Sequence, residues 1–136
     1  MIPAITLLFA ALHALLLLVL LVPISRLRHS RRIGLGDGGD AQLARSIRAH
    51  GNFIENAPFG LLLLALLELC RLPAPWLWVF GCALLLGRVM HAFGLSRSSG
   101  YSFGRFYGTA LTWLVLLAMA LAGAWLALRG IRAGAG

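Results

Sequence analysis

Apolar residues fill four long stretches of this chain, and short polar connections separate them. A helix needs roughly 20 apolar residues to cross the hydrocarbon layer of a bilayer, which is about 30 Å thick. Each stretch reaches that length, and none shows the strict alternation of apolar and polar residues that is typical of a half-buried strand. The pattern therefore predicts four membrane-spanning helices, over about residues 2–24, 41–69, 74–95 and 103–128.

The composition supports a membrane protein of one domain. The chain has 136 residues, of which 60% are hydrophobic and 12% are charged. A soluble domain carries about twice that share of charged residues, so a soluble enzyme is excluded, as is a disordered chain. We expect an all-α integral membrane four-helix bundle that uses residues 1–136 as a single domain.

All twelve basic residues are arginines, and with four acidic residues they give a net charge of +8. Such an excess could indicate nucleic-acid binding, but the chain has no basic amphipathic helix and no interleaving of basic and aromatic residues. The arginines instead flank the apolar stretches. We therefore expect contact with membrane lipids, and no nucleic acid.

The distribution of the arginines predicts the orientation in the membrane, because positively charged residues favour the cytoplasmic side. Nine of them lie in or beside the first and third connections, and three lie at the opposite side. Both arginine-rich connections are expected in the cytoplasm and both termini outside. The nine are Arg26, Arg28, Arg31, Arg32, Arg45, Arg48, Arg88, Arg97 and Arg105, and the three are Arg71, Arg129 and Arg132.

Polar residues form a stripe at the start of the second predicted helix. Arg48, Asn52 and Glu55 are spaced to share one helix face, and Arg45 lies one turn earlier. His50 points away from this stripe, toward a neighbouring connection or subunit. A carboxylate such as Glu55 is costly in a membrane unless it is paired. Two interpretations stay open, a structural ion pair with an arginine or a binding site.

Two further polar sets lie at the same membrane side. Arg88 and His91 share a face at the end of the third helix. The fourth helix begins with Tyr101, Arg105, Tyr107 and Thr109. Each set alone is compatible with interfacial anchoring, but together they predict a pocket for a small, multiply anionic molecule, with Glu55 available to an ammonium group.

Several other polar residues receive structural interpretations. We expect His13 to pack in the core with a backbone hydrogen bond, and Glu68 to pair with Arg71. The histidines and the two cysteines, Cys70 and Cys82, show no metal-ligand spacing, so no metal is expected. The glycine-rich segment 34–39 is interpreted as a flexible hinge or a lid over the pocket.

The chain resembles the bacterial branch of the MAPEG family, the membrane-associated proteins in eicosanoid and glutathione metabolism. The motif at the start of the second helix carries the resemblance, which extends over essentially the whole chain. Two weaker matches are Gly34-x-Gly36-Asp37-Gly38 and Arg88-x-x-His91. The motif is Arg45-x-x-Arg48-Ala-His50-x-Asn52-x-x-Glu55-x-x-Pro58.

The resemblance implies a homotrimer in a bacterial inner membrane, with glutathione bound as co-substrate between subunits at the cytoplasmic side. It implies a glutathione transferase or peroxidase, in which the bound thiolate attacks an apolar electrophile or a lipid hydroperoxide. By position, Arg105 matches an arginine that stabilises the thiolate. The implied glutathione-binding residues are Arg48, Asn52, Glu55, Arg88 and His91, and the polar residues near them, Arg45, His50 and Tyr101, are grouped with this site.

The chain departs from the family pattern at positions that bear on catalysis. Asn56 stands where many members carry an aromatic residue, and the tyrosines common in the third helix are absent. A non-catalytic binding protein of the same fold therefore remains an alternative. A small proton-coupled multidrug exporter that uses Glu55 is a second alternative, which the neighbouring arginines disfavour.

Overall fold

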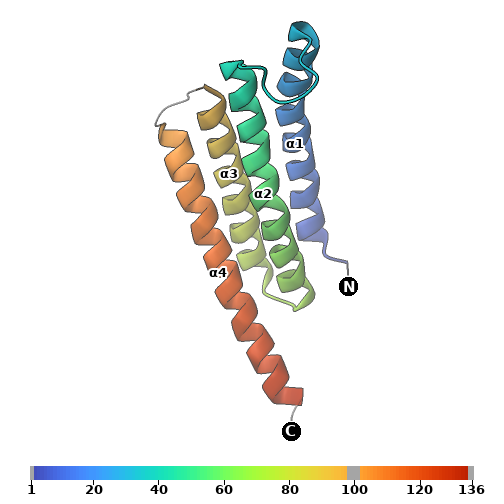
Figure 1. Cartoon of the computed structure of the whole chain (residues 1–136). Helices are drawn as coiled ribbons and strands as arrows, with labels where there is room; N and C mark the ends of the chain where they lie inside the picture. Colours follow the sequence, from blue (N-terminus) through green and yellow to red (C-terminus); the bar gives the residue numbers. More distant parts are fainter. Residues whose placement is uncertain (1, 98–101, 135–136) are drawn as a thin grey trace.

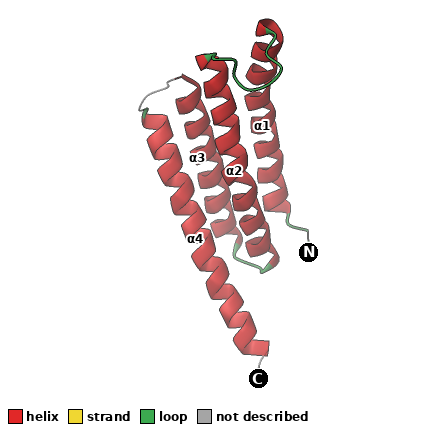
Figure 2. Ribbon diagram, viewed as in Figure 1, coloured by secondary structure: helices red, strands yellow, loops and turns green. Residues whose placement is uncertain are grey.

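The chain folds into four α-helices that lie side by side (Figure 1). The structure is a computed structural model that describes residues 2–97 and 102–134. Helix α1 spans Ala4–Arg31, α2 spans Ala41–Leu69, α3 spans Ala74–Arg97 and α4 spans Phe103–Gly134. The described residues contain no strand (Figure 2). All four helices are long and apolar enough to cross a membrane, which confirms the predicted all-α membrane bundle.

Helices α2 and α3 form the centre of the bundle. Each of them packs against the other and against both α1 and α4, whereas the backbones of α1 and α4 do not lie next to each other within the described residues. Figure 1 shows the C-terminal ends of α1 and α3 beside the N-terminal ends of α2 and α4. We call this the connection end. The two chain termini lie at the other end, which we call the terminal end.

Helix α1 continues seven residues past its predicted end, from 24 to Arg31, and passes through Pro23. A proline inside a helix removes one backbone hydrogen bond, but membrane-spanning helices tolerate this when neighbouring groups compensate. The helix stops at Arg32, which has a left-handed backbone with a φ of 54°. Helices α3 and α4 also extend beyond their predicted ends at 95 and 128, so these helix ends differ from the expectation.

The apolar interior consists of two clusters at different depths. A larger cluster near the middle and terminal end joins all four helices, and a smaller cluster near the connection end joins α1, α2 and α3. Large apolar side chains on the outer faces stay exposed, as expected for contact with lipid. The larger cluster contains Phe9, Leu64, Leu67, Leu77, Phe80, Leu84, Val115 and Met119; the smaller contains Leu20, Ala49, Phe53, Ala57, Ala92 and Leu95.

Glycines let α3 and α4 approach closely at the connection end. A Cβ atom added to Gly108 would lie 2.7 Å from the carbonyl oxygen of Gly87, and one added to Gly104 would lie 2.7 Å from the carbonyl oxygen of Met90. Small residues at such contacts allow backbones of membrane helices to pack directly. This packing fixes the start of α4 against the end of α3, where the predicted site residues lie.

Glu68 does not pair with Arg71, so that expectation is wrong. Its buried carboxylate instead accepts hydrogen bonds from the backbone N–H groups of Ile5 at 3.0 Å and Thr6 at 2.7 Å. The first N–H groups of a helix have no partner within the helix. A carboxylate placed there accepts their hydrogen bonds and also interacts favourably with the positive end of the helix dipole. Glu68 of α2 therefore caps the start of α1.

The connection between α1 and α2 is anchored at both ends, and the hinge or lid expected for its glycine-rich segment 34–39 stays a prediction. Asp40 accepts a hydrogen bond from the N–H of Leu43 at 2.8 Å and so caps α2. The same carboxylate forms an ion pair with Arg31 of α1, and Arg31 also donates to the side chain of Gln42 at 3.2 Å. These contacts tie the end of α1 to the start of α2.

Candidate functional site

Arg88 is the most buried of the predicted site residues, with 2% of its surface exposed. Its Nε and Nη2 donate to the hydroxyl oxygen of Thr112 at 3.0 and 2.7 Å. Its Nη1 donates to the side-chain oxygen of Asn52 at 2.7 Å and to the Asn52 carbonyl oxygen at 3.3 Å. The Thr112 hydroxyl in turn donates to the carbonyl oxygen of Gly108 at 2.7 Å. We call these residues the Arg88 network.

The Arg88 network joins three helices within one subunit, because Asn52, Arg88 and Thr112 belong to α2, α3 and α4. All three guanidinium nitrogens are used, and the positive charge is balanced by carbonyl and hydroxyl dipoles. A buried charge without such partners would be strongly destabilising. Arg88 and Asn52, both expected to contact glutathione, thus bind each other in this structure.

The polar stripe on α2 divides into an inner and an outer part. Asn52 faces the Arg88 network, whereas Arg48 and Glu55 form an exposed ion pair with 3.3 Å between Nη1 and Oε1. The side-chain amide of Asn56 donates to the carbonyl oxygen of Asn52 at 2.8 Å and therefore stays close to its own helix. The expected ion pair of Glu55 with an arginine is present, at the outer surface of α2.

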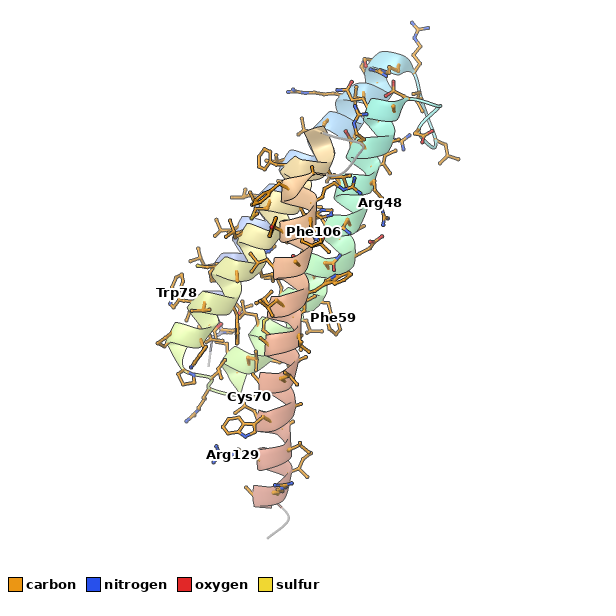
Figure 3. All side chains as sticks on the ribbon, turned by 90° about the vertical axis from the view of Figure 1, so that its left-hand side faces the viewer. Arg48, Phe59, Cys70, Trp78, Phe106 and Arg129 are labelled. Atoms are coloured by element: carbon orange, nitrogen blue, oxygen red, sulfur yellow. The ribbon has the colours of Figure 1, made fainter. Side chains whose placement is uncertain are left out.

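A pocket of about 700 Å³ opens between the end of α3 and the first three turns of α4. We call it the α4 pocket. Its polar residues are His91, Ser102, Arg105 and Thr109, and His91 is 7% exposed. Its apolar residues are Phe106, Ala110 and Trp113, of which Trp113 lies furthest along α4 from the connection end. Figure 3 shows Arg48 and Phe106 toward the connection end, with Phe59 deeper in the span.

A second pocket, of about 340 Å³, lies between the α1–α2 connection and α2. We call it the loop pocket. Gly36 and Asp37 of the connection line it together with the first turns of α2. Those α2 residues are Ala44, Ile47, Arg48 and Gly51. The loop pocket therefore shares Arg48 with the outer ion pair.

The remaining predicted residues are placed as follows. Arg45 has a buried Nε without a hydrogen-bond partner, and His50 is half-buried on α2. Tyr101 lies outside the described residues. Tyr107 packs its ring against Phe103, with 4.1 Å between ring centroids, at the exposed start of α4.

The expectation for His13 is confirmed. Its side chain is buried, and Nδ1 is 2.7 Å from the carbonyl oxygen of Phe9, so the ring bonds to the backbone one turn earlier. Its ring also lies beside Phe53 of α2, with 6.0 Å between ring centroids. His13 therefore belongs to the packed interior.

Sequence reasoning missed two residues of the site. Thr112 binds Arg88. A single threonine in an apolar run is a common feature of membrane helices, so the sequence did not indicate this contact. Asp37 lines the loop pocket, but the glycine-rich segment that contains it was interpreted as a hinge or a lid, with no binding role for its carboxylate. Within the described residues, no group of three or more histidine, cysteine or acidic side chains is placed to hold a metal ion.

Comparison with known proteins identifies relatives that match most of the chain. Residues 6–125 match the sequence profile of the MAPEG family. The inner membrane protein YecN of Escherichia coli K12 is 36% identical over 118 residues, which cover 87% of this chain and 88% of YecN. YecN of Escherichia coli O6:H1 matches to the same extent. With its four spans, the chain is a multi-pass inner membrane protein. A profile match over most of the chain and relatives at this identity show that the chain belongs to the MAPEG family.

Proposed function

We propose that this protein is a membrane-bound glutathione transferase or peroxidase that binds glutathione at the connection end and activates its thiol toward apolar electrophiles. The observation that carries this proposal is the α4 pocket. It combines Arg105 and His91 with an apolar wall that continues along α4 into the span. A polar co-substrate and an apolar substrate from the bilayer could meet there.

The charges of this end suit glutathione, which carries two carboxylates and one ammonium group at neutral pH. Arg48 is exposed on α2, and Arg105 lines the α4 pocket. Arginine binds carboxylates through two parallel hydrogen bonds, which favours recognition of such a ligand. Because the Arg88 network is internal to the subunit, we assign Arg88 and Asn52 to holding the site in shape.

Arg105 is the residue proposed to stabilise the thiolate. A free thiol has a pKa of about 8.5, so only a few per cent is ionised at pH 7. An adjacent guanidinium that lowers this pKa to about 7 would contribute roughly 2 kcal/mol. The thiol proton is released to water. In the transferase reaction the thiolate sulfur forms a bond to the electrophilic carbon as the leaving group departs with its electron pair. In the peroxidase reaction the sulfur attacks the hydroperoxide oxygen and releases the alcohol, and a second glutathione converts the resulting sulfenic acid into the disulfide and water.

The proposal includes a homotrimer with glutathione bound between neighbouring subunits. The apolar outer faces of α2 and α4 could pack against another subunit as well as against lipid. Native mass spectrometry in detergent should give a mass about three times that of the 14.6 kDa chain. The mass of a monomer would contradict the trimer. The thiol-activating site would then be tested separately.

An ultraviolet difference spectrum near 240 nm tests thiolate formation directly. Purified protein titrated with glutathione at neutral pH should give a saturable thiolate signal. Arg105→Ala should abolish the signal while most of the binding heat in calorimetry remains. Arg132→Ala, which removes an exposed arginine near the C-terminal end of α4, is the matched control and should leave the signal unchanged. A normal signal in Arg105→Ala would contradict the role of Arg105.

Binding without turnover is the second candidate, and Asn56 favours it. This position carries an aromatic residue in many family members, whereas here its side chain is bonded to the backbone of its own helix. In that case calorimetry would detect glutathione binding that depends on Arg48 and Glu55, and no signal would appear near 240 nm. If the spectrum shows no thiolate signal and calorimetry detects no glutathione binding, both the enzyme and the non-catalytic binding protein are excluded.

A further inference from the structure

Asp37 is the acidic residue whose side chain has no partner on another element of the subunit within the described residues. The chain has four acidic residues, and all of them lie in the described ranges. Asp40 pairs with Arg31, Glu55 pairs with Arg48, and Glu68 caps α1. These three therefore have structural partners.

Within the described residues, the side chain of Asp37 accepts one short-range hydrogen bond. Its Oδ1 accepts from the backbone N–H of Gly39 at 2.9 Å, and no ion pair to it exists within the described residues. One oxygen is therefore used for the turn, and the other is available to a ligand. In a chain with a net charge of +8, an unpaired carboxylate is a distinctive source of negative potential.

The loop pocket places this carboxylate near a cation that can bind a ligand. Asp37 and Arg48 both line its volume of about 340 Å³, and the rest of the lining consists of glycine, alanine and isoleucine. An acidic and a basic group on the walls of a small, otherwise apolar pocket match a ligand that carries both charges. The α-amino and α-carboxylate groups of an amino acid are such a pair.

The connection that carries Asp37 is held in place before any ligand binds. Ile33 donates its N–H to the carbonyl oxygen of Arg28 at 3.0 Å, and Arg28 donates its Nη1 to the carbonyl oxygen of Ile33 at 3.4 Å. Gly36, Gly38 and Gly39 have φ values of 67°, 59° and 78°, which glycine adopts without steric cost. A preorganised wall reduces the entropy lost on binding.

We propose that the loop pocket binds the zwitterionic amino-acid end of the ligand, with Asp37 accepting its ammonium group and Arg48 binding its carboxylate. For glutathione this end is the γ-glutamyl group. The proposal rests on the proposed function and changes one of its assignments, since Glu55 was expected to receive the ammonium group. Glu55 does not line the loop pocket, whereas Asp37 and Arg48 do. The ion pair with Glu55 engages Nη1 of Arg48, and the proposal uses the other nitrogens of that guanidinium for the ligand carboxylate.

Calorimetry on the full-length protein in detergent tests this assignment with two ligands. One is glutathione, and the other is glutaryl-cysteinyl-glycine, which lacks only the ammonium group. Asp37→Asn removes the charge but keeps an oxygen that can accept the Gly39 N–H, so the turn should persist. Leu35→Ala, at a fully exposed position of the same connection, is the control for general effects on the loop.

Asp37→Asn should weaken glutathione binding about tenfold, as expected for loss of a charge-assisted hydrogen bond. The deaminated ligand should bind the unaltered protein about tenfold more weakly than glutathione, and Asp37→Asn should not weaken it further. Leu35→Ala should bind both ligands as the unaltered protein does.

Other results overturn the assignment. An equal loss for both ligands in Asp37→Asn would mean that Asp37 acts only through the loop. Unchanged glutathione binding in Asp37→Asn would reject the ammonium contact while the proposed function stands. If the unaltered protein binds neither ligand, both this inference and the proposed function are wrong.

Discussion

At the scale of single residues, the Arg88 network shows what a pattern of polar positions can and cannot predict. The sequence indicated that polar residues of three helices would gather at one end, and the structure brings Asn52 of α2, His91 of α3 and Arg105 of α4 there. It did not indicate that Arg88 would bind Thr112, because that contact depends on how α3 and α4 are rotated against each other. Buried donors take whichever acceptor the packing supplies.

Substitution of Arg88 by methionine should destabilise the protein strongly. Methionine fills similar space but leaves the Asn52 side chain and the Thr112 hydroxyl without their donor in a buried position. The free energy of unfolding should fall by about 3 kcal/mol, as measured by denaturant titration in micelles. Arg48→Met is the matched control on the exposed surface and should cost less than about 1 kcal/mol. Equal effects of the two changes would contradict the structural role of Arg88.

At the scale of helices, the sequence predicts that the four helices form, but it does not predict where each of them ends. Length and apolarity alone predict the four spans, since a bilayer imposes a minimum length on each. The predicted end of α1 at about residue 24 lies next to Pro23, a residue type that commonly ends helices, but α1 continues through this proline to Arg31. The cap of α1 was missed because its carboxylate, Glu68, lies more than 60 residues away in the sequence.

Removal of the Glu68 carboxylate should loosen the start of α1. Glu68→Ala leaves the N–H groups of Ile5 and Thr6 without an acceptor, and loss of a helix cap costs about 1–2 kcal/mol. Glu68→Gln keeps one oxygen and should cost less. Hydrogen exchange of the first turn of α1 should accelerate in the alanine variant before that of α4 changes. Uniform acceleration in all helices would point to a general loss of packing instead.

The close contact of α3 and α4 should not tolerate a methyl group. Gly108→Ala would place Cβ 2.7 Å from the carbonyl oxygen of Gly87 and 3.0 Å from the Cα atom of His91. Overpacking of this kind costs about 1–3 kcal/mol and should shift the thermal unfolding midpoint downward. Gly130→Ala on the same helix meets no atom within 4 Å and should be neutral or stabilising, because alanine favours helix. A neutral Gly108→Ala would show that the two helices can separate without cost.

At the scale of the whole molecule, the structure places the end of α1, the start of α2, the end of α3 and the start of α4 at one end, and the α2–α3 connection and both termini at the other (Figure 1). Four helices joined by short connections must alternate in direction, so this arrangement follows from the number of spans. The excess of arginine at the connection end predicts that this end is cytoplasmic.

Cysteine labelling in oriented vesicles should establish that orientation. Ser30 near the end of α1 and Ala133 near the end of α4 are both exposed, and they lie at opposite ends of the molecule. Single cysteines at these positions, in a chain whose Cys70 and Cys82 are replaced by alanine, would be treated with a membrane-impermeant maleimide. In inside-out vesicles Ser30→Cys should react and Ala133→Cys should not, and right-side-out vesicles should give the reverse. The opposite pattern would put the candidate glutathione site outside the cytoplasm, where the proposed reaction would lack the cellular pool of reduced thiol.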